Sequence, residues 1–154
     1  MQQEPTDYVI EVHSTWEGVS EPEWDALWAQ QALPTPFMRH AYLASLQASG
    51  SATAETGWDL RVLCLRHQGQ LLAACPLYLK THSYGEYVFD WAWADAYQRH
   101  RLAYYPKAVI AVPFTPVPGT RLMAKTQTAR EALLSAAVDF CQGQGLSSLH
   151  LLFG

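Results

Sequence analysis

The sequence lacks several features that would assign it at once to a class of protein. None of its 154 residues lie in a run that approaches the roughly 20 apolar residues of a membrane-spanning helix. The N-terminus, Met1 to Pro5, has neither the basic nor the apolar region of a signal peptide. Lys and Arg number only 10 against 14 Asp and Glu, which disfavours bulk nucleic-acid binding. These absences predict a cytoplasmic protein without a membrane span.

The sequence is also poor in the residues that build disulfide or metal sites. Its three cysteines, Cys64, Cys75 and Cys141, are odd in number and lie in apolar runs, so we expect buried, reduced thiols. The six histidines form no helical pair with a glutamate and show no short spacing to a second ligand. We therefore expect no metal site. Neither a Gly-x-Ser-x-Gly elbow nor a phosphate-binding P-loop occurs.

Length and composition predict one globular domain with a core of its own. Hydrophobic residues make up 49% of the chain and charged residues 16%, which excludes a disordered tail. The charged fraction is low for a domain with an average surface, so some apolar surface is expected to face another body. We treat residues 1–154 as a single lobe.

Periodicity and turn signals predict alternating helices and strands. The hairpin is expected to be antiparallel, and the last helix is expected to cross between parallel strands, which together give a mixed sheet. The predicted fold class is α/β, with helices on the faces of the sheet. The expected elements are a strand from Tyr8 to His13, helices that begin at Ser20 and Thr35, paired strands at 58–67 and 70–81, a helix at 94–102, a strand at 108–112, a helix at 126–142 and a strand at 146–153.

The segment from Ser83 to Tyr97 has the most unusual composition in the chain. It holds six aromatic rings and three carboxylates within fifteen residues. Aromatic side chains bring large apolar area with a polar tip, and carboxylates seldom lie among them without a partner. This mixture is typical of the wall of a pocket.

Two carboxylates of this segment, Glu86 and Asp90, are the candidate catalytic residues. Desolvation among aromatic rings would raise a carboxyl pKa toward neutrality, as a general base for an amine requires. The alternative is that each caps a helix or turn, or binds an arginine. The candidate substrate-binding residues are Lys80, His82, Tyr87, Trp91, Trp93, Asp95, Tyr105 and Lys107. The alternative for the cationic ones is solvated charge at strand ends.

A third candidate group is Gly119, Thr120 and Arg121, which lies just before a predicted helix. Free backbone donors and the positive end of a helix dipole favour an anion such as a pyrophosphate, and an arginine adds a bidentate contact. These three are the candidate cofactor-binding residues. An ordinary surface loop is the alternative.

The order of elements is similar to the acyl-CoA N-acyltransferase (GNAT) fold, in which a strand, a loop and a helix form the acyl-carrier site. Three pieces of the sequence also resemble the bacterial FemAB-like family, which is associated with peptidoglycan biosynthesis or recognition. These pieces are Pro76–Ser83, Gly85–Trp91, and Tyr104–Lys107 taken with Val112–Val117. Upstream, the resemblance rests on Trp24, Pro36-Phe37 and Gly57-Trp58.

The resemblance implies an acyltransferase or aminoacyltransferase that acts on an amine, with acyl-CoA or an aminoacyl donor. Members of this family look like two GNAT-type halves in one chain, so this sequence looks like the N-terminal half. The implied partners are a missing C-terminal lobe or a second copy in a homodimer, and a small-molecule or peptide acceptor. The alternative is a non-catalytic interaction module whose aromatic segment binds a partner domain or itself.

Overall fold

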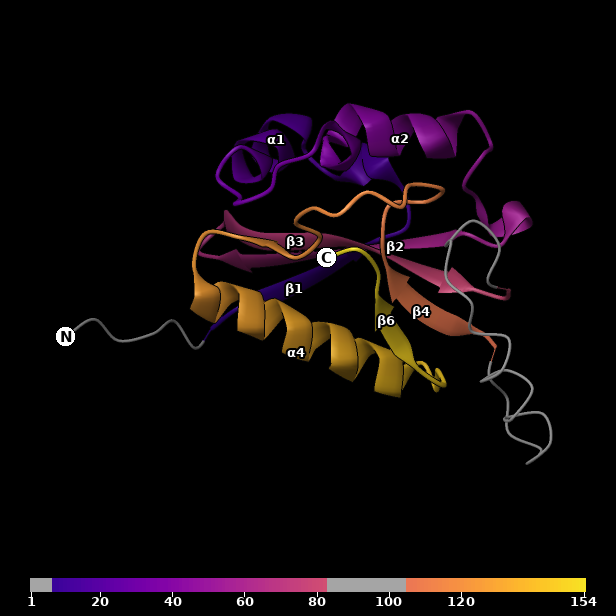
Figure 1. Cartoon of the computed structure of the whole chain (residues 1–154). Coiled ribbons are helices and arrows are strands. Elements are labelled where there is room, and N and C mark those ends of the chain that lie inside the picture. The colour runs from indigo at the N-terminus through magenta and orange to yellow at the C-terminus, as the bar shows by residue number, and fades with distance from the viewer. Residues whose placement is uncertain (1–6, 83–104) are drawn as a thin grey trace.

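The computed structural model describes residues 7–82 and 105–154. These residues form one mixed sheet with helices on both of its faces (Figure 1). The strand order is β1-β2-β3-β4-β6, and the short β5 pairs with β3. The strands are β1 (Val9–His13), β2 (Asp59–His67), β3 (Gln70–Lys80), β4 (Lys107–Ile110), β5 (Met123–Ala124) and β6 (Leu149–Leu151). The predicted mixed layer is confirmed, although its last strand is shorter than the expected 146–153.

The first helix begins where the sequence predicts. Helix α1 (Glu21–Trp28) follows Ser20, whose hydroxyl accepts a hydrogen bond from the Glu23 amide at 3.4 Å. Pro22 lies in the first turn, where a backbone N–H would have no partner within the helix, so proline costs no hydrogen bond there. Trp24, within this helix, is fully buried, and its indole N–H donates to the Met38 carbonyl at 2.7 Å.

The predicted start of the second helix at Thr35 is wrong. Pro36 opens only a single 3-10 turn, η2 (Pro36–Met38), after which Arg39 is extended with φ −71° and ψ 147°. Helix α2 (His40–Ala48) starts after this break. The His40 amide donates to an Asp25 carboxylate oxygen at 3.1 Å, so the acceptor for this helix start comes from α1. Two further 3-10 turns are η1 (Trp16–Gly18) and η3 (Ala54–Thr56).

The centre of the sheet is the predicted hairpin. Strands β2 and β3 pair antiparallel around a tight turn at Gln68 and Gly69, both of which have positive φ as a two-residue hairpin turn requires. Strand β3 also pairs antiparallel with β4, while β4 and β6 are parallel. Helix α4 (Gln127–Gly143) makes the crossover between β4 and β6, and the Thr126 hydroxyl caps its N-terminus.

The core has two layers, one on each face of the sheet. Helices α1 and α2 cover one face and α4 covers the other (Figure 1). Buried residues of the first layer include Trp16, Trp24, Leu43, Trp58 and Val62. The second layer includes Leu63, Leu65, Cys75, Leu133 and Ala137. The sheet is therefore covered on both sides, and all three cysteines are buried as predicted.

The loop between β4 and α4 runs on the same side of the sheet as α1 and α2, and the last residues of the chain lie beside it (Figure 1). The Gly119 amide donates to the Phe153 carbonyl at 2.9 Å, and the Thr120 amide donates to the Leu33 carbonyl at 3.1 Å. Three segments distant in sequence thus meet at this loop. No helix within residues 7–82 and 105–154 has both the length and the apolar character needed to cross a membrane.

Candidate functional site

The predicted site residues divide into a part that the structure describes and a part that it does not. Both candidate catalytic carboxylates and four of the candidate ligand contacts fall within 83–104, outside the described residues. Their roles remain predictions from the sequence. These residues are Glu86, Tyr87, Asp90, Trp91, Trp93 and Asp95.

Two predicted cationic residues, Lys80 and Lys107, lie opposite each other. Lys80 ends β3 and Lys107 begins β4, and they are direct partners in the antiparallel register. Both are fully buried, so the interpretation of solvated charge at strand ends is wrong for them. The Lys80 ammonium lies 3.6 Å from the centroid of the Trp58 ring, and the Lys107 ammonium lies 5.8 Å from that of Tyr105. A buried ammonium is stabilised by such a ring because the face of the ring is negative.

His82 is the second residue after β3 and lies against the turn formed by η3. Its Nε2 is 3.1 Å from the Thr56 carbonyl oxygen. Gly57, which follows Thr56, has φ +87°, and a Cβ on it would come within 2.3 Å of Nε2 of His82. A side chain at this position would be strained by the positive φ and would have to displace the imidazole, so glycine fits here. His82, Lys80, Tyr105 and Lys107 all lie at the same end of the β3–β4 pair.

Trp58 connects this cationic end to the loop that follows β4. Its ring makes an edge contact with Tyr78 at 5.2 Å and a tilted contact with Phe114 at 5.5 Å, measured between centroids. Phe114 belongs to the loop and is 40% exposed. Trp58 itself is buried at 1% exposure. Its contacts on both sides were not predictable, because they depend on residues 20 to 56 positions away.

The third predicted group surrounds a buried guanidinium. Arg121 is only 1% exposed, although it lies in a loop. Its Nη2 donates to the Val117 carbonyl, but within the described part of the chain its Nε and Nη1 have no hydrogen-bond partner. Burial lowers the pKa of Arg121 from its ordinary value. Two unpaired donors on a buried cation are rare and call for an explanation.

A third unpaired polar atom belongs to Thr35, which packs against the same glycine as this guanidinium. The Thr35 hydroxyl is buried and has no hydrogen-bond partner among residues 7–82 and 105–154. A Cβ on Gly119 would lie 2.6 Å from the Thr35 methyl carbon and 3.2 Å from Nη1 of Arg121. Thr35, Gly119 and Arg121 are thus packed together. The sequence signal at Thr35 predicts only a helix start and gives no indication of its place beside Arg121.

The end of the loop is anchored where α4 begins. Gln31 accepts a hydrogen bond from the Ala124 amide and donates one to the Ala124 carbonyl, both at 3.1 Å. Arg130, in the first turn of α4, donates from Nε to the Leu122 carbonyl at 3.1 Å. The hydroxyl of Thr126 accepts from the Ala129 amide at 3.1 Å and so caps the start of the helix. The strand, loop and helix therefore form one connected unit.

Comparison with known proteins identifies the family. The FemAB-like family of peptidoglycan biosynthesis/recognition matches residues 15–154. The chain belongs to this family. No functionally curated protein shows significant similarity to the FemAB-like chain.

Solved structures identify the fold of this FemAB-like chain. Ribosomal-protein-alanine N-acetyltransferase from Brucella melitensis biovar Abortus 2308 superposes with a TM-score of 0.51 and 13% identity, covering 94% of this chain and 79% of that one. Aminoglycoside N-acetyltransferase AAC(6')-Iy, solved in complex with CoA, gives 0.50 and 9%, covering 98% and 80%. The predicted GNAT-like fold is confirmed. The unit formed by β4, its loop and α4 corresponds to the predicted strand, loop and helix.

Proposed function

We propose that this FemAB-like lobe takes part in transferring an acyl or aminoacyl group to an amine, and that its main role is to bind a peptide- or amine-bearing acceptor. The acyltransferase-like fold and the family support the reaction class. The observation that carries the transfer reaction, through its donor, is the buried Arg121 guanidinium on the loop between β4 and α4, two of whose donors are unpaired among the described residues. An anionic group would give those donors the partners they lack.

The donor in this proposal is acyl-CoA or an aminoacyl compound with an anionic carrier. The similar aminoglycoside acetyltransferase was solved with CoA, which is consistent with the first choice. Gly119, Thr120 and Arg121 would hold its pyrophosphate together with the first turn of α4. Because Nε and Nη1 of Arg121 are shielded from solvent, the segment before Thr120 has to move for the anion to reach them.

The acceptor in this proposal lies at the cationic end of β3 and β4. Lys80, Lys107 and His82 would surround a carboxylate or phosphate of the acceptor. The aromatic residues of 83–104 would bind its apolar parts, with Asp90 or Glu86 taking the proton from the attacking amine. The Trp58–Phe114 contact supports this arrangement, because two adjacent rings join the cationic end to the loop between β4 and α4, which we call the donor loop.

A non-catalytic interaction role is the second candidate. Strand β6 lies at one edge of the sheet, and its Leu151 side chain is 47% exposed. An exposed strand edge can accept a strand from another body. In this candidate a second lobe or a second copy of the chain pairs with β6 in the cytoplasm. The lobe then contributes binding and no chemistry.

Ligand-dependent stability separates the two candidates. We expect CoA, acetyl-CoA or a peptidoglycan stem peptide to raise the melting temperature of the chain. At a ligand concentration of 100 times Kd the gain is about 2.7 kcal/mol, equal to roughly 5–11 °C for a domain of this size. If the chain dimerises and none of these ligands shifts its melting temperature, the interaction role is correct and the transferase proposal is wrong.

A further inference from the structure

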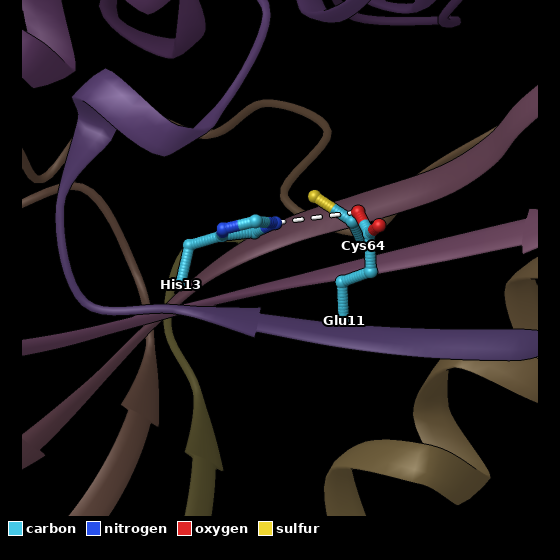
Figure 2. A group of neighbouring side chains, drawn as sticks. All are labelled: Glu11, His13 and Cys64. Carbon is cyan, nitrogen blue, oxygen red and sulfur yellow. Dashed lines mark hydrogen bonds and ion pairs between the residues drawn. The ribbon is translucent and has the colours of Figure 1, made fainter.

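A mixed set of metal-ligating side chains lies on the paired strands β1 and β2, at the opposite edge of the sheet from β6. Glu11 and His13 are two positions apart on β1, so their side chains leave the same face of the sheet. Cys64 is the direct partner of Glu11 on β2. One ligand atom from each residue lies within 4.8 Å of the other two. Figure 2 shows the imidazole, carboxylate and thiol pointing toward one another.

Neighbouring residues hold these side chains in this arrangement. Gly18, at the end of η1, comes so close to His13 that a Cβ there would lie 2.9 Å from Nδ1. The opposite nitrogen, Nε2, faces Glu11 at 3.3 Å. On the far side, Nε of Arg66 donates to the same Glu11 oxygen at 2.8 Å. Contacts of this kind orient the ligands of a metal site.

We propose that Glu11, His13 and Cys64 bind a zinc ion, with water in the fourth position. Zinc takes thiolate sulfur at about 2.3 Å and imidazole nitrogen or carboxylate oxygen at about 2.0–2.2 Å. Tetrahedral coordination therefore places ligand atoms about 3.3–3.8 Å apart. Closing the remaining gap from 4.8 Å takes small side-chain rotations, in which the partly exposed side chains of His13 and Glu11, at 26% and 37%, exchange their mutual hydrogen bond for the metal.

The charges around this site are balanced when zinc is bound. The ion carries two positive charges, which the Glu11 carboxylate and the Cys64 thiolate neutralise. Arg66 is neutralised in turn by Glu23, whose two carboxylate oxygens accept from its Nη1 and Nη2 at 2.9 and 3.1 Å. Binding breaks the Cys64 S–H bond, forms the Zn–S bond and releases one proton to solvent.

The sequence predicts no metal site because its spacing rules concern ligands on one helix or in one loop. Here two ligands are alternate residues of an edge strand, and the third is 51 positions further along the chain. Antiparallel pairing of β1 with β2 brings them together. The inference is independent of the transferase proposal, because it uses none of the donor-loop or acceptor residues.

Titration of the metal-free full chain with Co²⁺ tests the proposal. We expect thiolate-to-cobalt charge-transfer absorption that saturates at one equivalent and disappears when zinc is added. His13→Gln should weaken zinc binding by more than about tenfold, since loss of even an outer partner costs about 10–100-fold. Cys64→Ser should abolish the charge-transfer band. The matched controls are His67→Gln, with a side-chain exposure of 23%, and Cys141→Ser on α4, and both should bind as the unchanged chain does.

Two results would overturn the proposal. One is the absence of the charge-transfer band in the unchanged chain. The other is a His13→Gln variant that binds the metal with the same affinity as the unchanged chain. If Cys64→Ser fails to fold because its side chain is buried, His13→Gln still decides the matter, because His13 lies partly exposed on the edge strand.

Discussion

Replacing Arg121 by methionine should stabilise the protein and at the same time remove its response to CoA. Methionine keeps an unbranched side chain of similar reach but carries no charge. Each buried donor left without a partner costs about 1–3 kcal/mol, and Arg121 has two of them. In the variant the Val117 carbonyl loses its donor, and this loss cancels about 1 kcal/mol of the gain in stability. The expected net gain is about 1 kcal/mol or more, or roughly 2–4 °C in melting temperature.

Urea denaturation without ligand and thermal denaturation with CoA measure the two effects. Arg39→Met is the matched control, because the Arg39 side chain is 52% exposed and its ion pair with Asp25 is worth only about 0–1 kcal/mol. The control should not gain stability and should keep the CoA shift. If Arg121→Met is instead less stable by more than about 2 kcal/mol, or responds fully to CoA, Arg121 is a structural residue and the donor-site reasoning fails.

Two further predictions concern stability alone. Hydrogen bonds from Arg66 lower the pKa of both Glu11 and Glu23 below 4.5, so the stability they contribute is present above that pH and is lost as pH falls through their folded pKa values. In Arg66→Gln the free energy of unfolding should therefore depend less on pH between about pH 5 and 3. An acid profile of the variant identical to that of the unchanged chain would contradict this. Gly57→Ala should cost more than Gly50→Ala when unfolding free energies are compared, because both have positive φ but only the first places its Cβ 2.3 Å from a neighbouring imidazole nitrogen. Equal losses would show that the imidazole moves away freely.

Periodic and capping signals made most of the fold predictable. The helix expected at 126–142 is found at Gln127–Gly143, because its cap at Thr126 and its apolar spacing agree. The hairpin turn was predictable because a glycine, Gly69, which readily adopts the positive φ of a tight turn, lies between two apolar runs. The start of the second helix was not predictable. Thr35 and Pro36 have the residue types of a helix start, but they open only a single 3-10 turn, which the extended Arg39 ends.

The candidate site was less predictable, because burial of charge is a tertiary property. The sequence places Lys80 and Lys107 at strand ends, where lysines are usually solvated, and gives no sign that they are partners in one antiparallel register. Arg121 is similar, since a loop arginine before a helix is usually exposed. The meeting of Glu11 with Cys64 depends on strand pairing, which the spacing of ligands along the chain does not reveal.

Hydrogen exchange of the chain with and without CoA reports where the donor binds. We expect slower amide exchange in the loop and first helical turn between residues 113 and 130, with no change in β1. Protection confined to other elements, or no protection at saturating CoA, would contradict the assignment of the donor site to this loop.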